Sequence, residues 1–259
     1  MPNLSTPSLG AVHTAMITPM TADHEVDLDG AARLAQHLID LGNDGLVLNG
    51  TTGEAPTTTD EEKAELLRAV RSTVGPDVPL IAGVGTNDTR HSIELARQAE
   101  AAGADGLLVV TPYYSKPSQE GILAHFTAIA DATELPVMLY DIPGRSAVPI
   151  GVDTLLRAAE HPRIVAVKDA KADLAAATAV LRASDLLWYS GDDALNLPFL
   201  SIGAVGFVSV AGHLIADRLR SMLSAFGAGD TRTATTIFYD SEPVAVGLFR
   251  APAVTLTKA

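Results

Sequence analysis

The architecture of this chain is indicated first by the run Ile164-Val165-Ala166-Val167, which Lys168 and Asp169 follow directly. A short apolar run rich in β-branched residues is typical of a buried strand in a parallel sheet. Lys168 therefore stands where that strand leaves the core. Burial disfavours the ammonium form of a lysine and lowers its pKa, and a neutral amine is a nucleophile toward carbonyl carbon. A lysine that only ends a strand and extends to solvent is the commoner case, so its neighbours must decide.

Similar apolar runs recur along the chain and alternate with Ala- and Leu-rich helical segments. The expected strands are Val12–Thr18, Gly45–Asn49, Leu80–Gly83, Gly106–Thr111, Val137–Tyr140, Ile164–Lys168, Leu187–Ser190 and Gly206–Val210. The expected helices include Leu28–Leu41, Asp60–Ser72, Thr89–Ala101, Gln119–Asp131 and Ala172–Ala183. This alternation predicts a (β/α)8 TIM barrel. A doubly wound open sheet is the competing architecture, but no G-x-G-x-x-G follows the first strand.

Local signals mark the ends of several expected helices. Thr59, with Glu62 three residues later, is typical of a capping box at a helix start. Gly42, Gly103 and Gly227 are expected just past helices, where a left-handed residue closes the last turn.

The composition suits one large domain. Hydrophobic residues make up 47% of the 259 residues, and no Gly/Pro/Ser-rich linker divides them. We expect residues 1–230 to form the barrel and residues 231–259 to begin a C-terminal helical region.

Charge and cysteine content argue against several classes of protein. A formal net charge of -13 disfavours a binder of nucleic acid or of membrane surfaces. No apolar stretch is long enough to span a bilayer. The absence of cysteine excludes disulfides and thiolate metal sites and fits a reducing cytosol, so we expect a cytoplasmic protein. The N-terminus also lacks the basic and apolar segments of a signal peptide.

Active sites of TIM barrels lie at the carboxyl ends of the strands, so the residues after each apolar run are the candidates. Gly50-Thr51-Thr52-Gly53-Glu54 follows the second run, and its amides and hydroxyls can hold a carboxylate. Taken alone, an ordinary capped turn explains this loop better.

Tyrosines gather after the fourth and fifth runs. Three of the five tyrosines lie in Thr111-Pro112-Tyr113-Tyr114 and Tyr140-Asp141-Ile142-Pro143-Gly144-Arg145. Tyr140 can act as a general acid or base if a lysine or hydroxyls lie nearby. Arg145 offers a planar fork for a carboxylate. The alternatives are aromatic packing at the barrel rim and a loop arginine in solvent.

Lys168 is the only lysine expected at a strand end, since Lys171 lies beyond the strand. The seventh run ends in Ser190-Gly191-Asp192-Asp193. Its adjacent acids are a weak metal signal, and helix N-capping is the favoured interpretation. Gly191 can let a ligand approach the backbone. The seven histidines show no paired spacing, so neither a metal nor a cofactor is expected.

Together, these strand ends offer an amine, tyrosines, hydroxyls and one arginine. That set suits Schiff-base chemistry on a 2-oxo acid, in which the amine attacks the ketone and the iminium acidifies the adjacent methyl group.

The same motifs, with Thr111-Pro112-Tyr113-Tyr114-Ser115-Lys116-Pro117 and Val167-Lys168-Asp169, resemble the dihydrodipicolinate synthase (4-hydroxy-tetrahydrodipicolinate synthase) family of pyruvate-dependent class I aldolases. The resemblance runs from about Ala15 to the last residue. It implies a lyase that condenses pyruvate with L-aspartate 4-semialdehyde in the diaminopimelate route to lysine. It implies no cofactor other than the covalent pyruvate imine.

The resemblance also implies a role for each residue. Lys168 would form the imine, and Tyr140 would be the main acid and base. Tyr140 would be linked through Thr51 to Tyr114, which in the family reaches in from a neighbouring subunit, so a dimer or tetramer is expected. The substrate-binding residues would be Thr52 for the pyruvate carboxylate, Arg145 for that of the semialdehyde, and Gly191 and Val208 along the pocket.

Two departures from the family pattern stand out. Members inhibited by lysine resemble one another in carrying histidines on the helix after the Thr-Thr loop and a glutamate further along. Here the matching positions are Asp60, Lys63 and His91, so we hypothesise weak or absent lysine feedback. The chain also stops at Ala259, where members usually continue, so we expect the C-terminal helical extension to be largely missing.

Two alternatives stay open. A lyase for a sugar-derived 2-oxo acid, such as N-acetylneuraminate lyase or a 2-keto-3-deoxy acid aldolase, would share Lys168 and Tyr140. Arg145, with Thr51 and Tyr114 as a relay, favours the synthase. A catalytically dead barrel that binds a metabolite or a partner protein is the other alternative, which the complete set of strand-end residues disfavours.

Overall fold

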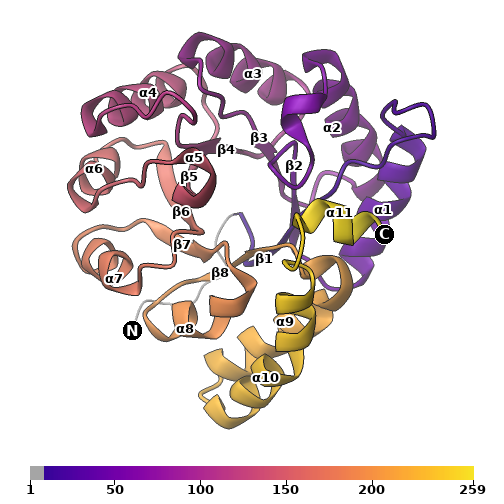
Figure 1. Cartoon of the computed structure of the whole chain (residues 1–259), viewed down its shortest axis with the longest axis vertical. Helices are drawn as coiled ribbons and strands as arrows, with labels where there is room; N and C mark the ends of the chain where they lie inside the picture. Colours follow the sequence, from indigo (N-terminus) through magenta and orange to yellow (C-terminus); the bar gives the residue numbers. More distant parts are fainter. Residues whose placement is uncertain (1–8) are drawn as a thin grey trace.

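The computed structural model describes residues 9–259 and shows eight parallel strands closed into a barrel in chain order (Figure 1). The strands are β1 (Val12–Ala15), β2 (Gly45–Leu48), β3 (Leu80–Gly83), β4 (Gly106–Val110), β5 (Val137–Asp141), β6 (Ile164–Asp169), β7 (Leu187–Ser190) and β8 (Gly206–Ser209). β1 pairs with both β2 and β8, which confirms the predicted (β/α)8 barrel and excludes the open sheet.

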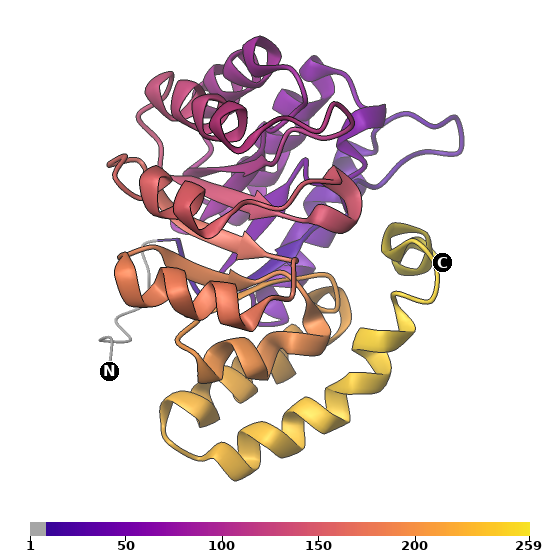
Figure 2. The same ribbon diagram turned by 60° about the vertical axis from the view of Figure 1, so that its left-hand side comes forward.

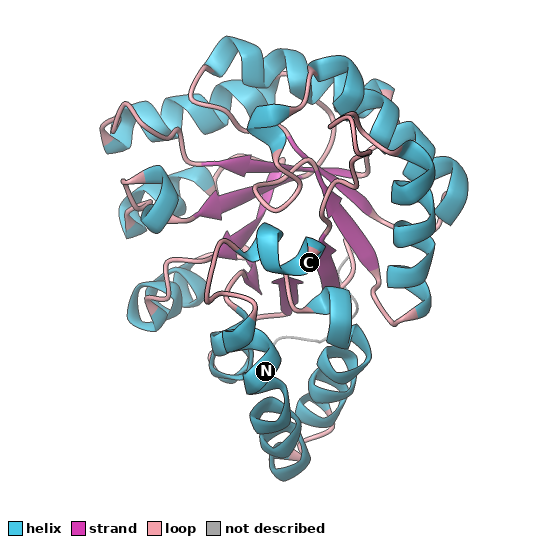
Figure 3. Cartoon of the chain, turned by 45° about the vertical axis from the view of Figure 1, so that its right-hand side comes forward, coloured by secondary structure: helices cyan, strands magenta, loops and turns pink. Residues whose placement is uncertain are grey.

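Helices enclose the ring of strands, as Figure 3 shows. They are α1 (Leu28–Asp40), α2 (Asp60–Val74), α3 (Thr89–Ala101), α4 (Gln119–Asp131), α5 (Pro143–Ser146), α6 (Val152–Ala158), α7 (Leu174–Ala183), α8 (Asn196–Ser201), α9 (Gly212–Gly227), α10 (Thr231–Gly247) and α11 (Ala253–Lys258). Short 3-10 turns, η1 (Ala55–Thr57) and η2 (Asp193–Leu195), precede α2 and α8.

The helix-end signals hold at four of five positions. Thr59 and Glu62 form the predicted capping box, with their side chains bonded to each other's backbone N–H groups at 3.2 and 2.7 Å. Gly42 and Gly103 adopt the left-handed conformation past α1 and α3. Gly227 was predicted wrongly, because α9 includes it and the left-handed residue is Gly229, with a φ of 80°.

The core has two layers, because successive strand residues point to opposite faces of the sheet. Side chains inside the barrel form one cluster, which includes Val47, Ile81, Met138, Ala166, Tyr189 and Val208. Side chains on the outer face pack under the helices, including Leu46, Leu80, Leu107, Val137, Val167 and Trp188. Both faces are thus buried, as the continuous apolar runs predicted.

The first strand is shorter than predicted and ends at Ala15 rather than Thr18. The ladder stops after Met16, and the next backbone N–H, that of Ile17, donates to Nε2 of His213 at 3.1 Å. The Thr18 hydroxyl donates to the backbone oxygen of Gly53 at 2.7 Å. The end of β1 therefore supports the loop after β2 instead of extending the sheet.

Two helices, α10 and α11, follow the barrel. The expectation that the C-terminal helical extension is largely missing is therefore wrong. α10 packs along α9, and the chain then turns so that α11 approaches the strand ends (Figure 2). There Lys258 forms an ion pair with Glu54 of the loop after β2. None of the helices between Leu9 and Ala259 combines the length and apolar character needed to span a bilayer.

Candidate active site

Lys168 lies near the end of β6 and is buried, with 4% of its surface exposed. Its Nζ lies 4.2 Å from the centre of the Tyr140 ring, and the two residues are direct partners across β5 and β6. Burial lowers the pKa of Lys168 to about 8; the charge of Asp193 opposes this shift and that of Arg145 adds to it. At that pKa roughly one amine in ten is neutral at pH 7, against fewer than one in a thousand for an ordinary lysine.

Tyr140 supplies a proton donor beside this amine. It is 5% exposed, and burial raises its pKa to about 12, while the charge of Arg145 and a hydrogen bond with Thr51 partly oppose the rise. The phenol therefore stays protonated at neutral pH and can donate its proton to a developing oxygen charge. Tyr140 and Thr51 therefore lie close enough within one subunit to influence each other.

The loop after β2 places Thr51 beside Tyr140 and leaves Thr52 half-buried next to it. Its conformation depends on Gly53, because a Cβ atom there would lie 3.2 Å from the backbone oxygen of Met16. The loop is therefore packed tightly against the end of β1, which fixes the two hydroxyls at the barrel mouth.

The end of β7 closes the opposite side of the lysine. A Cβ atom at Gly191 would lie 3.0 Å from both Cγ and Cε of Lys168, so only glycine leaves the lysine side chain its present room. Val208 is buried in the barrel interior. Gly191 therefore borders the lysine side chain, and the pocket-lining roles of Gly191 and Val208 stay predictions.

Sequence reasoning missed the part that Asp193 plays. Asp192 caps η2 by accepting a hydrogen bond from the backbone N–H of Ala194 at 3.0 Å, as predicted. Asp193 instead accepts bonds from the backbone N–H groups of Val210 and Ala211 at 2.9 and 2.8 Å. It thereby places a fixed negative charge close enough to influence Lys168. No sequence pattern signals this tertiary contact. Within residues 9–259, no cluster of His, Asp or Glu is arranged to hold a metal ion.

A cavity of about 450 Å³ opens beside these residues. Thr51, Tyr140 and Arg145 line it, so three of the predicted site residues share one space. Lys168 is not among the residues that line the cavity, and the Tyr140 ring lies against its amine. A small carbonyl compound would reach the amine past this ring.

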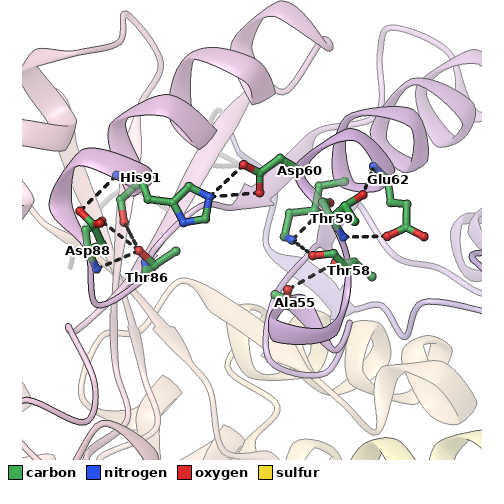
Figure 4. Close-up of polar contacts among 10 residues, drawn as sticks. Ala55, Thr58, Thr59, Asp60, Glu62, Thr86, Asp88 and His91 are labelled. Carbon is green, nitrogen blue, oxygen red and sulfur yellow. Dashed lines mark hydrogen bonds and ion pairs between the residues drawn. The ribbon is translucent and has the colours of Figure 1, made fainter.

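The outer part of the cavity is walled by α2 and α3 and carries Asp60, Lys63 and His91. The Nε2 atom of His91 lies 2.9 Å from a carboxylate oxygen of Asp60, as Figure 4 shows. The Nζ atom of Lys63 donates to the backbone oxygen of Thr58 at 2.6 Å. The charged groups of this wall are therefore already partnered within the chain.

Tyr114 does not join the site of its own subunit. Its side chain is 87% exposed, and its backbone is left-handed, with a φ of 72°, which is uncommon for a residue other than glycine. Tyr113 lines the cavity in its place. Among the predicted residues, Lys168, Tyr140, Thr51 and Arg145 lie together at the carboxyl ends of the strands.

Comparison with known proteins places this arrangement in a family. Residues 8–259 match the dihydrodipicolinate synthetase family. The chain is 62% identical to 4-hydroxy-tetrahydrodipicolinate synthase 2 of Streptomyces coelicolor, over 98% of this chain and 86% of that protein. It is 59% identical to the 4-hydroxy-tetrahydrodipicolinate synthase of Mycolicibacterium paratuberculosis, over 97% and 84%.

Solved structures agree with these sequence relatives. Dihydrodipicolinate synthase from Bacillus anthracis superimposes with a TM-score of 0.94 at 46% identity, covering 96% of this chain and 86% of that one. The enzyme from Cyanidioschyzon merolae, solved with lysine bound, gives a TM-score of 0.95 at 41% identity, covering 97% and 87%. The chain therefore belongs to the dihydrodipicolinate synthetase family.

Proposed function

We propose that this chain is a lyase of the class I aldolase type that condenses pyruvate with L-aspartate 4-semialdehyde to give 4-hydroxy-tetrahydrodipicolinate. One observation carries the proposal most directly: the buried amine of Lys168, with a pKa of about 8, lies 4.2 Å from the centre of the Tyr140 ring at the mouth of a barrel. Relatives at 57–62% identity that bear the synthase name supply the choice of reaction.

The first half of the reaction follows from the two side chains. The neutral Lys168 amine attacks the keto carbon of pyruvate, and the protonated phenol of Tyr140 donates a proton to the oxygen that leaves as water. The resulting iminium carries a positive charge that Asp193 stabilises. It acidifies the methyl group of pyruvate, and the Tyr140 phenolate takes up a proton from that group, which gives a nucleophilic enamine and restores the phenol.

The second half needs a place for the aldehyde substrate. Arg145, on α5 at the edge of the cavity, offers its guanidinium to the carboxylate of the semialdehyde. Thr52 is assigned to the pyruvate carboxylate. The enamine then attacks the aldehyde carbon, and the amino group of the semialdehyde displaces Lys168 as the ring closes. No metal or separate cofactor enters this scheme.

Tyr114 enters the proposal through a second subunit. A tyrosine that is 87% exposed on a strained loop near the mouth is suited to reach the Thr51 hydroxyl of a neighbouring copy. The site would then be complete only in a dimer or larger homo-oligomer. Such a relay lets protons pass between Tyr140 and solvent through Thr51 and Tyr114.

This assembly can be tested by mixing two inactive chains. Co-expressed Lys168→Ala and Tyr114→Phe chains form mixed dimers in which one site holds both native residues. If subunits pair at random across a symmetric interface, about a quarter of the parent activity returns. Activity no greater than the average of the two separate variants would show that Tyr114 acts in its own subunit or not at all.

The chemistry itself is tested by reduction. Borohydride added with pyruvate should leave a stable adduct on one peptide, located by mass mapping at Lys168. A substrate screen then distinguishes the alternatives: pyruvate with aspartate semialdehyde for the synthase, against sialic acid and keto-deoxy acids for a sugar-acid lyase. No adduct on the folded parent chain would instead favour a catalytically dead binding barrel.

A further inference from the structure

Each residue of the pair Lys168 and Tyr140 is followed by a buried carboxylate. Asp141 follows Tyr140 on β5, and Asp169 follows Lys168 on β6; they are 1% and 0% exposed. Just as Tyr140 pairs with Lys168 across the two strands, Asp141 pairs with Asp169. Because neighbouring strand residues point to opposite faces, the carboxylates lie behind the site, on the outer face of the barrel.

Lys171 contacts both carboxylates. Its backbone N–H donates to Oδ1 of Asp169 at 2.7 Å, and its Nζ lies 2.9 Å from Oδ2 of Asp141. The same Nζ donates to the backbone oxygen of Ile150 at 3.1 Å, and the N–H of Ile150 donates to Oδ1 of Asp141 at 3.1 Å. One residue therefore bridges β5 and β6 immediately beyond Tyr140 and Lys168.

This bridge is costly to build. Burial raises the pKa of both Asp141 and Asp169, which means that their charged forms are disfavoured where they stand. Over residues 9–259, neither Oδ2 of Asp169 nor Oδ2 of Asp141 finds a hydrogen-bond partner, so Lys171 contacts the Asp141 side chain as an ion pair. Ala172, whose N–H also bonds Asp169, is left-handed with a φ of 67°. Apolar residues often stabilise such a position equally well, so stability alone does not explain the charges.

We propose that Lys171 is a positioning residue that staples β5 to β6 and so keeps the ring of Tyr140 against the amine of Lys168. The proposal rests on the proposed function for the roles of Tyr140 and Lys168, but the predicted geometry needs no substrate. Without the staple the two strand ends can separate, and water then reaches the amine. Lys168 would regain part of its ordinary basicity and lose its proton donor.

The test measures the basicity of Lys168 with a small reagent. Cyanate carbamylates only the neutral amine, so the rate of labelling at Lys168, followed by peptide mass mapping, rises with pH through its pKa. In the parent chain we expect the midpoint near 8. Lys171→Met should raise the midpoint by about one pH unit, because exposure reverses part of the desolvation. Lys171→Arg keeps the charge and the reach and should restore it to within about 0.3 units.

A matched control removes an ion pair elsewhere. Arg220→Met breaks the pair between Arg220 and Asp44, which lies before β2 at the other end of the barrel. It should leave the labelling midpoint of Lys168 unchanged even if it lowers the melting temperature as much as Lys171→Met does. A shift in this control as large as that of Lys171→Met would reduce the effect to general loosening and overturn the proposal.

Asp141→Asn separates positioning from simple charge. Removing the positive charge of Lys171 would by itself raise the Lys168 midpoint, whereas removing the negative charge of Asp141 would by itself lower it. Loss of the staple raises the midpoint in both variants. Upward shifts in both support the proposal, and opposite shifts or none overturn it. If Lys171→Met does not fold, Asp141→Asn decides alone.

The staple and the reaction can fail separately. If the parent chain gives no borohydride-reduced adduct with pyruvate, the proposed function fails. The pH dependence of cyanate labelling still tests whether Lys171 holds β5 and β6 together. If the adduct forms, its initial rate at saturating pyruvate should fall about tenfold in Lys171→Met and stay within about twofold in Lys171→Arg.

Discussion

Two of the titratable pairs buried in the barrel differ in access, because a member of one pair lines a cavity. Lys168 and Tyr140, the rim pair, lie near the carboxyl ends of the strands beside the cavity of about 450 Å³. His13 and Tyr189, the floor pair, are both 0% exposed, with ring centres 5.8 Å apart. Tyr189 is the strand partner of Lys168 across β6 and β7, but its hydroxyl points to Gly10, which precedes β1.

Burial shifts the pKa values of both pairs in the same sense. It lowers the pKa of His13 to about 4 and raises that of Tyr189, as it lowers that of Lys168 and raises that of Tyr140. The difference is access: the Tyr189 hydroxyl donates to the backbone oxygen of Gly10 at 2.8 Å, whereas Tyr140 lines the cavity. A shifted pKa marks a functional site only where a substrate can arrive.

The largest expected effect is at the rim. Lys168→Ala removes the nucleophile, so both the borohydride-trapped adduct with pyruvate and the condensation rate should fall by at least about a thousandfold. Lys116→Ala, which removes an exposed loop lysine, is the control and should keep the adduct. An adduct of undiminished amount in Lys168→Ala would place the imine on another residue.

The two tyrosines give a direct contrast between the pairs. Tyr140→Phe removes the proton donor and should slow condensation about a hundredfold. Tyr189→Phe removes a bond to the backbone oxygen of Gly10, and Tyr189 does not line the cavity. It should therefore leave the rate within about twofold and lower the free energy of unfolding by about 1 kcal/mol. Steady-state assays and chemical denaturation measure the two effects. Equal slowing by both substitutions would remove the distinction between rim and floor.

The floor pair should affect how the free energy of unfolding depends on pH. The folded pKa of His13, about 4, lies below its usual 6.5, so the unfolded chain binds a proton more readily than the folded chain. Stability is therefore complete above pH 6.5 and decreases as the pH falls toward 4, by about 3 kcal/mol from this residue.

Denaturation curves between pH 7 and 4 measure that loss. His13→Gln cannot take up the proton, so its free energy of unfolding should fall less steeply with acidification than that of the parent. The comparison must be made as a difference, because burial also lowers the pKa of His125 to about 4. Parallel curves for the parent and His13→Gln would mean that His13 titrates normally.

The contrast also explains what the sequence could predict. Both faces of a parallel sheet are buried, so each strand is a continuous apolar run, and the residue after each run is visible without a structure. Lys168, Tyr140 and Gly191 were found in this way. The rim pair can be recognised in the sequence because a polar residue follows each apolar run.

Contacts between segments that are distant in the sequence could not be predicted from such a pattern. The adjacent acids Asp192 and Asp193 indicate a helix cap, but the carboxylate of Asp193 accepts hydrogen bonds from Val210 and Ala211 after β8. Lys171 lies beyond its strand in the sequence, so no strand-end pattern includes it. Its ion pair with Asp141 depends on how β5 and β6 are aligned. The exposed position of Tyr114 follows from its left-handed backbone, which the surrounding sequence motif does not predict.

The smallest expected effect concerns the outer wall of the same cavity. Asp60 is paired with His91, and the ammonium of Lys63 is bonded to Thr58, so an incoming cationic amine meets a resident positive charge and no unpartnered carboxylate among these three residues. L-lysine at millimolar concentration should therefore change the condensation rate by less than about twofold.

Titrating L-lysine into the condensation assay, with and without Lys63→Ala, sharpens this last point. If the resident ammonium is what excludes a cationic ligand, the substitution should let L-lysine inhibit measurably while the uninhibited rate stays within about twofold. Micromolar inhibition of the parent chain would show instead that the pairs open at little cost. The outer wall would then resemble the rim in accepting a ligand, and access rather than resident charge would govern the whole cavity.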